Sequence, residues 1–488
     1  MAIVSLKRKT FLGLKWTALQ QVITQGATFI IGVLLMRFLS PKEFGLLAMV
    51  TVFSSFLNIF QDFGLTSSLI QKKNIKDGDQ QVIFWVMLVI SIILAGVLFL
   101  SSGFLADFYE EPEVSKIAKV LSATFIIGVF GSVNSAVLRR NMRFKEISLF
   151  RSLSVSISGI IAVYLAYKGF GVWSLVSQNI INISLFSVLI SFKGDFKPKL
   201  MFKKDTLKEH LSFGIPLFGS RSLNYFSKNT DKLLIGKFLT KSDLGIYTRA
   251  FNLLYLPVHK VGLVFTGVLF SAFSKMKSDS SKISGIYLNI TKLIIYGLAP
   301  FLILLQVYTR DIVVKLFGIE WVGIVLLVKV FIWLIFFHVL TLLRSNICLS
   351  QGHSRLEFHY SFFGAVLDLI AVGTGIAFGI EWVAINLVVS MFIKSVYSIH
   401  LMSKSLMVSF SKMLKGLLPA VIVLFLSYSV GYLASIGIES FISLFYFKVG
   451  ILLTLLIMTL LITVKLLDKK VYYFALQNIR LLYSNKQK

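Results

Sequence analysis

The sequence contains one motif twice, as RFLSPKEFG at residues 37–45 and as KFLTKSDLG at residues 237–245. The offset is 237 − 37 = 200, and Phe38, Leu39 and Gly45 recur identically. The basic residue that opens the motif, the hydroxyl residue and the acid recur with their chemistry preserved. Self-similarity at a fixed offset indicates an internal duplication. The two glycines are expected to permit close helix packing rather than to bind a ligand.

A second, weaker pair fits the same duplication. It is GFGVW at residues 169–173 against GIEWV at residues 379–383, with an offset of 379 − 169 = 210. Chance convergence of helix junctions explains this pair equally well. Together the pairs fit a six-helix unit present twice. Because six is even, both copies enter the membrane from the same side, about an axis along the membrane normal.

The composition predicts an integral membrane protein. The chain of 488 residues is 56% hydrophobic and 15% charged, whereas a soluble domain is about a quarter charged. Residues 83–105 and 417–438 contain no charge and are each long enough to cross a bilayer. Backbone polar groups in lipid must be satisfied within a helix. Fourteen helices are expected, at about 14–38, 44–63, 82–106, 117–138, 151–168, 172–192, 210–238, 244–272, 287–309, 322–350, 358–380, 382–402, 414–436 and 441–465.

The basic residues predict the orientation in the cell membrane. The net charge of +28 is not a nucleic-acid signature, because the basic clusters recur between alternate hydrophobic blocks. The intervening loops are short and often acidic. Both termini are therefore expected to be cytoplasmic, and the first block is expected to be a retained helix rather than a signal peptide. The basic clusters are Lys7–Lys9, Lys72–Lys76, Arg139–Lys145, Lys193–Lys208, Lys275–Lys282, Lys404–Lys415 and Lys469–Lys488.

These patterns give a domain organisation. Residues 1–192 are expected to form an N-terminal six-helix bundle, and residues 210–403 a second one. Residues 193–209 are expected to form a cytoplasmic linker, and residues 404–488 two additional helices with a basic tail. The chain has one cysteine, Cys348, so no intramolecular disulfide forms, and no metal or cofactor motif is present.

With the motifs in view, the chain resembles the polysaccharide-transport family of the multidrug/oligosaccharidyl-lipid/polysaccharide exporter superfamily, the Wzx-type flippases. The resemblance is carried by the first motif copy with QDFGL at 61–65, and by DKLLIGKFL at 231–239 with LGIY at 244–247. It implies two six-helix bundles in a V around a central cavity. It implies alternating access and a substrate of undecaprenyl pyrophosphate carrying an oligosaccharide for lipopolysaccharide or exopolysaccharide synthesis. Lys232 stands where Arg is expected, and Lys241 replaces the proline of the first copy.

Two alternative functions stay open at this stage. One is a multidrug or peptidoglycan-precursor exporter of the same superfamily, and the other, in a different class, is a membrane glycosyltransferase or polymerase. Loops of at most about 25 residues leave no room for an extramembrane enzyme domain, so the chain is not expected to be an enzyme. H⁺ or Na⁺ is a candidate coupling ion because no nucleotide-binding motif appears, and polysaccharide assembly proteins are candidate partners.

Ionisable residues within membrane segments are the candidate site, because burying a charge in lipid is costly. On the seventh helix, four polar residues are spaced 3, 4 and 3 and share one face. Two of them, Arg221 and Lys228, are the candidates for neutralising the diphosphate. Asn224 lies between them, and Asp231 either pairs with a neighbouring cation or carries protons.

The remaining candidates are spread over four helices. Further cavity cations are Arg249, Lys260 and Arg344, and Asn252 shares a helix face with the first of these. Asp62 has either an ion-coupling role or a helix-end role. Asp368 is expected to have a cationic partner, because an unpaired carboxylate deep in a bilayer would neutralise instead. The sequence does not identify that partner.

Overall fold

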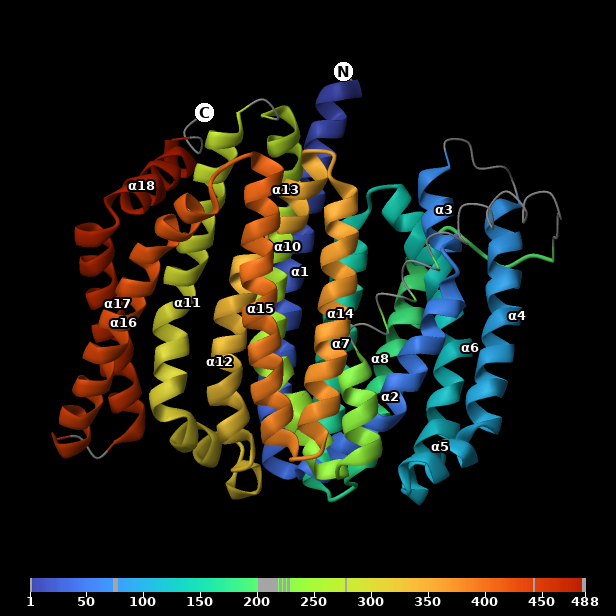
Figure 1. Cartoon of the computed structure of the whole chain (residues 1–488). Helices are drawn as coiled ribbons and strands as arrows, with labels where there is room; N and C mark the ends of the chain where they lie inside the picture. Colours follow the sequence, from blue (N-terminus) through green and yellow to red (C-terminus); the bar gives the residue numbers. More distant parts are fainter. Residues whose placement is uncertain are drawn as a thin grey trace. The chain divides into compact units, whose positions relative to one another are not determined.

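The computed structural model describes residues 2–72, 78–200, 229–276, 279–441 and 444–484, together with Phe218, Ser222 and Tyr225. Side chains are described from Trp16 onward, except Ala18, most residues between 256 and 271, and residues 439–441 and 478–484. Within this part of the chain every regular element is helical, which confirms the all-α fold (Figure 1).

The helices in chain order are α1 (Ala2–Phe38), α2 (Pro41–Asp62), α3 (Leu65–Gln71), α4 (Asp79–Leu100), α5 (Ser102–Tyr109), α6 (Pro112–Arg140), α7 (Phe144–Tyr167), α8 (Val172–Lys193), α10 (Lys241–Lys275), α11 (Ser280–Leu316), η1 (Ile319–Trp321), α12 (Ile324–Thr341), α13 (Arg344–Ser350), α14 (Ser354–Ile376), α15 (Ile380–Leu406), α16 (Phe410–Phe441), α17 (Phe445–Leu467) and α18 (Lys469–Ser484). Residues 229–238 are also helical.

Twelve of the helical segments in the described residues are long and apolar enough to cross a membrane. The expected count of fourteen stays a prediction, because most of the segment expected at 210–238 lies outside the described residues. Two boundaries differ from expectation. The helix expected at 82–106 divides at Ser101 into α4 and α5, and the helix expected at 322–350 divides before Arg344 into α12 and α13. Helix α2 begins early, at Pro41, because proline is favoured in the first helical turn.

The chain forms two compact units. The first contains residues 1–248 and 316–321, and the second contains residues 249–315 and 322–488. The boundary at 193–209 that the repeat suggests stays a prediction.

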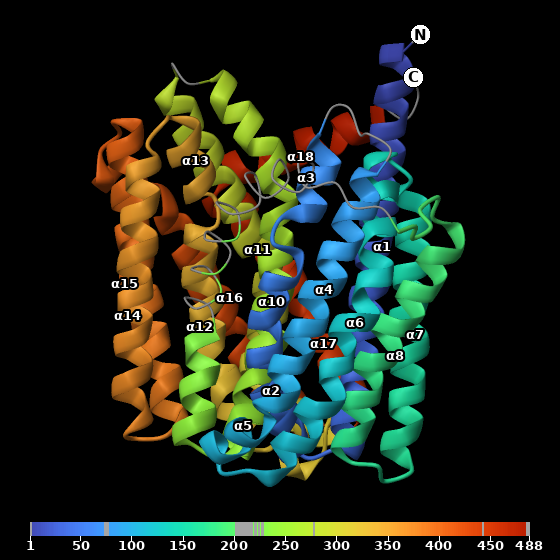
Figure 2. The ribbon, with the colours of Figure 1, turned by 90° about the vertical axis from the view of Figure 1, so that its right-hand side faces the viewer.

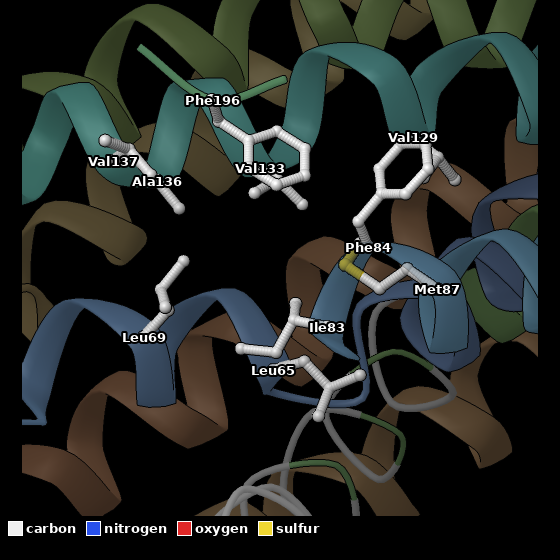
Figure 3. Packing of buried hydrophobic residues seen from close by; sticks show 10 residues of the cluster. All are labelled: Leu65, Leu69, Ile83, Phe84, Met87, Val129, Val133, Ala136, Val137 and Phe196. Carbon is white, nitrogen blue, oxygen red and sulfur yellow. The ribbon is translucent and has the colours of Figure 1, made fainter. Parts of the chain in front are cut away.

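In the first unit, five long helices pack side by side (Figure 2). Helix α1 packs on α7, α7 on α8, α8 on α6 and α6 on α4, while α2 contacts α4, α6 and α8. At one end, α3, α4 and α6 enclose a hydrophobic core, and Phe196 from the segment after α8 enters it (Figure 3). The core residues are Leu65, Leu69, Ile83, Phe84, Met87, Val129, Val133, Ala136, Val137 and Phe196.

The segment from Gly194 to Leu200 is docked on this core by side chains of α4 and α6. The Asn134 carboxamide oxygen accepts the Phe196 N–H at 3.2 Å. The Gln81 side chain donates to the Lys197 carbonyl at 2.8 Å and accepts the Lys199 N–H at 2.6 Å. The first half of the expected linker is therefore fixed to the first unit, and its second half lies outside the described residues.

In the second unit, α15 packs on α12 and α14, and α16 packs on α17. A buried ion pair ties the end of α17 to α11. The Lys292 Nζ lies 2.8 Å from the Asp468 carboxylate, and the side chains are 7% and 4% exposed. The Tyr296 hydroxyl donates to the same carboxylate at 3.0 Å. This contact fixes the point from which α18 begins, in the region that was expected to add two helices to the repeat.

Candidate functional site

The two copies of the repeated motif pack directly on each other in the first unit. A Cβ atom added to Gly45 would lie 1.7 Å from the Lys241 carbonyl oxygen, and one added to Gly245 would lie 2.0 Å from the Pro41 carbonyl oxygen. Replacing each residue by its counterpart in the other copy, 45 by 245 and 241 by 41, turns the first contact into the second. Such reciprocity is the mark of a local two-fold relation. The glycines thus permit a helix crossing, as expected, and both copies lie at the same end of the unit, as a parallel repeat requires.

Each copy also begins its helix with a hydroxyl residue that contacts the acid three positions later. In the first, the Ser40 hydroxyl donates to the Glu43 carboxylate. In the second, the Asp243 carboxylate accepts both the Thr240 hydroxyl, at 2.7 Å, and the Thr240 N–H, at 3.1 Å. The Asp243 N–H donates back to the Thr240 hydroxyl at 3.1 Å. This is a capping box, which satisfies donors at a helix start.

The neighbours of the two copies differ. The Trp321 indole N–H donates to the Met36 carbonyl at 2.7 Å and the Leu39 carbonyl at 3.1 Å, so it caps the end of α1. Its ring is fully buried and meets Phe44 edge to face. The second copy is held by charge instead. Its ion pairs are Lys237 with Glu110 at 3.2 Å and Lys241 with Glu111 at 2.8 Å.

Tyr109 completes the contact of the α5 end with the second copy. A Cβ atom on Gly236 would lie 2.8 Å from the Tyr109 ring, so only glycine fits beneath it. Burial raises the pKa of the Tyr109 phenol, which therefore stays neutral and packs as an apolar ring.

The candidate cations of the seventh helix, Arg221 and Lys228, lie outside the described residues, as does Asn224. Asp231 is described. It accepts a hydrogen bond of 2.5 Å from the hydroxyl of Tyr247, a fully buried residue of α10. A tyrosine hydroxyl is therefore one partner of this carboxylate, for which the sequence predicts a cation partner or a bound proton.

The Asp62 carboxylate binds the first turn of α3. It accepts the Thr66 N–H at 3.1 Å and the Thr66 hydroxyl at 2.6 Å. These bonds give Asp62 the helix-end role that the sequence left open beside ion coupling.

Arg249 and Asn252 lie one turn apart on α10, and both are half-buried. The Lys260 side chain lies outside the described part of this helix. Arg344 is buried and already forms an ion pair. Its guanidinium forms a two-pronged ion pair with Glu357 and lies 3.5 Å from the centre of the Tyr360 ring. Such a forked geometry suits arginine.

Asp368 has the partner that burial in a membrane requires. The Lys394 ammonium lies 2.6 and 2.7 Å from its two oxygens, and the Ser390 hydroxyl donates to one of them at 2.7 Å. The sequence analysis did not identify Lys394 as this partner. The spacing of polar residues on α15 was the available signal, because Ser390 and Lys394 share one helix face.

A cavity of about 470 Å³ lies between α6 and α8 in the first unit. All its lining side chains are apolar or serine: Ile126, Ile127, Phe130, Ser184, Ser187, Val188, Ser191 and Phe192. Such a lining does not suit an anionic head group, since a buried charge needs a partner.

Known proteins are similar to this chain in sequence and in fold. The chain is 25% identical to the lipopolysaccharide biosynthesis protein WzxC of Escherichia coli K12, over 76% of each chain. It is 26% identical to the teichuronic acid biosynthesis protein TuaB of Bacillus subtilis, over 78% of this chain and 80% of that one. Its fold matches a structure of the lipid II flippase MurJ in an inward closed conformation, with a TM-score of 0.71, 15% identity and coverage of 94% and 99%.

A multidrug-resistance transporter of the MATE family in an inward-facing conformation matches with a TM-score of 0.58, at 16% identity over 81% of this chain and 96% of that one. These two matches to solved structures establish the fold. Residues 34–326, more than half of the chain, match a family described as polysaccharide biosynthesis protein. The chain belongs to this family.

Proposed function

We propose that this protein flips oligosaccharides linked to undecaprenyl pyrophosphate across the cell membrane, from the cytoplasmic to the outer face, by alternating access. The observation that carries the proposal is membership of the polysaccharide biosynthesis family by a chain whose described residues are almost all membrane helices. A protein built almost entirely of membrane helices is suited to moving cargo across the bilayer. The fold that it shares with a lipid II flippase supports transport rather than catalysis.

The orientation forms part of the proposal. With cytoplasmic termini, the crossing of the two motif copies lies at the outer face, because α1 runs from the N-terminus to the first copy. The docked segment after α8 then lies at the cytoplasmic face. H⁺ or Na⁺ coupling and contact with polysaccharide assembly proteins remain proposals beside it.

The negative charge of the diphosphate cargo determines which side chains the transport pathway needs. A charge at the bilayer centre costs several kcal/mol, by estimates from about 3 to over 10. A diphosphate therefore needs cations along its path. We assign this role to Arg221, Lys228 and Arg249. Arg344 is a weaker candidate than the sequence suggested, because Glu357 already neutralises it.

Reconstituted liposomes test the function. A fluorescent undecaprenyl-diphosphate oligosaccharide would be placed in both leaflets, and a membrane-impermeant quencher would report flipping. Wild-type protein is expected to expose the inner pool. Arg249→Ala should slow exposure by about tenfold or more, since a lost cation raises the barrier by over 1 kcal/mol.

Arg355→Ala is the matched control, because it removes the same charge from an exposed position at the start of α14. Equal rates for both variants would remove Arg249 from the pathway. No exposure by the wild-type protein, together with efflux of an organic cation, would favour the multidrug alternative instead.

A further inference from the structure

One polar seam joins α14 and α15 through the second unit. Asn386 donates to the Ala371 carbonyl at 3.3 Å and to the Thr374 hydroxyl at 3.1 Å. About one turn further along α15, Ser390 and then Lys394 bind Asp368. The seam continues with Tyr397, whose ring stacks on Tyr360 at 6.2 Å. Because α14 and α15 run antiparallel, later positions on α15 meet earlier positions on α14.

The centre of the seam is built around the lysine. A Cβ atom on Gly364 would lie 3.2 Å from Lys394 Cδ, so the glycine leaves space for the lysine stem beside α14. The ammonium then reaches both oxygens of Asp368, at 2.6 and 2.7 Å. The lysine side chain is 12% exposed and the aspartate 29%. The better-covered partner is therefore the cation, held in place by packing as well as by charge.

The neighbouring charges on the same side of α14 are also neutralised. Arg344 pairs with Glu357 one turn before Tyr360 and lies against the Tyr360 ring. Together these four groups comprise two cations and two anions. The seam thus offers no excess negative charge that would attract a free cation.

This arrangement bears on how transport is driven. A carboxylate within a membrane helix is a natural site for a coupling cation. Here the ammonium occupies the position in front of both oxygens, and a hydroxyl takes a further lone pair. A sodium ion could enter only by displacing the ammonium, which cannot leave the protein.

We propose that Lys394 is a tethered cation that takes the place of a bound coupling ion at Asp368, so that transport by this chain does not require Na⁺ there. The proposal rests on the proposed flippase function for its transport readout. Lys394 acts through Asp368 and is a positioning residue for the α14–α15 pair.

The first experiment measures binding of radioactive Na⁺ to the purified full-length protein. Asp368→Asn is expected to leave Na⁺ binding unchanged, because Asp368 holds no Na⁺ in the wild-type protein. Loss of a bound Na⁺ in Asp368→Asn would overturn the proposal. This measurement needs no transport, so it separates failure of this inference from failure of the flippase assignment.

The second experiment measures flipping with Na⁺ or K⁺ as the only monovalent metal ion. The ratio of the rates in Na⁺ and in K⁺ should agree within about twofold between the wild type and Asp368→Asn, because Na⁺ does not act at Asp368. Lys394→Gln should lower the rate about tenfold, because it leaves the partly buried Asp368 carboxylate without its cation. Lys394→Arg should keep most of the rate, and the neutral pair Asp368→Asn/Lys394→Gln should recover it.

A wild-type rate that rises with Na⁺, with the rise abolished in Asp368→Asn, would overturn the proposal. Failure of the neutral pair to recover activity when the protein reaches the membrane at normal levels would also contradict it. If Lys394→Gln does not fold, the comparison of the wild type with Asp368→Asn and the neutral pair still decide.

Discussion

The two copies of the repeated motif share the same backbone contacts but are held by different side-chain partners. In both, a glycine allows a backbone carbonyl of the other copy to approach, and a hydroxyl–acid contact begins the helix. Around the first copy the partner is a buried indole, and around the second it is a set of partly exposed ion pairs. Backbone contacts at a two-fold crossing constrain both copies at once, whereas each side-chain partner constrains only one. The repeat therefore kept its glycines and diverged in its surroundings.

The largest effect is expected from breaking what the copies share. Gly45→Ala and Gly245→Ala would each place a methyl group within 2.0 Å of a backbone carbonyl oxygen. Because backbone cannot rotate away, each should cost at least about 3 kcal/mol, the upper range for overpacking. Thermal unfolding in detergent would show a large and similar loss for both.

Gly285→Ala is the control, since nothing lies within 4 Å of its added Cβ on α11. Unequal losses for the two motif glycines would argue against the reciprocal crossing.

The next largest effect is expected from changing Trp321, the buried partner of the first copy. Trp321→Phe keeps an aromatic ring against Phe44 but removes the N–H that caps Met36 and Leu39. Two carbonyls at the end of α1 lose a donor, with an expected cost of about 1–3 kcal/mol. The change in unfolding midpoint measures it. Trp333→Phe, at an exposed tryptophan of α12, should change little.

The helix starts should differ by a smaller amount. Thr240→Ala removes the two hydrogen bonds of the capping box that involve the Thr240 hydroxyl and should cost about 1 kcal/mol. Ser40→Ala should cost less, because the Ser40 hydroxyl contacts only the Glu43 side chain and Pro41 has no N–H to satisfy. Matched thermal unfolding curves would rank the pair. An equal or larger loss for Ser40→Ala would contradict this ranking.

The smallest effect is expected from the ionic partner of the second copy. Glu111→Gln breaks the pair with Lys241, whose side chains are 22% and 30% exposed. Partly exposed pairs contribute about 0–1 kcal/mol and weaken with salt. The difference from wild type should therefore shrink in high salt. A salt-independent loss as large as that of Trp321→Phe would mean that both copies are held equally firmly.

Much of this architecture could be predicted from residues. Long uncharged runs gave the membrane helices, and the matched nonapeptides gave the duplication and the packing role of Gly45 and Gly245. The requirement that Asp368 be paired also follows from sequence, because a lone carboxylate in lipid is unfavourable. The identity of its partner did not follow, since several lysines and arginines lie on neighbouring helices. The same ambiguity explains why Arg344 was selected as a cavity cation although Glu357 holds it.

The sequence by itself determined that this protein is built of membrane helices, because hydrophobic length acts locally and needs no partner. It also determined that two segments 200 residues apart pack in the same way. Only the tertiary structure decided which charges among the described residues neutralise each other. Ion pairing depends on distances of a few ångströms between helices, and the sequence fixes only the face of a helix on which each charge lies. Trp321 shows this most clearly, because its partners Met36 and Leu39 lie more than 280 residues away.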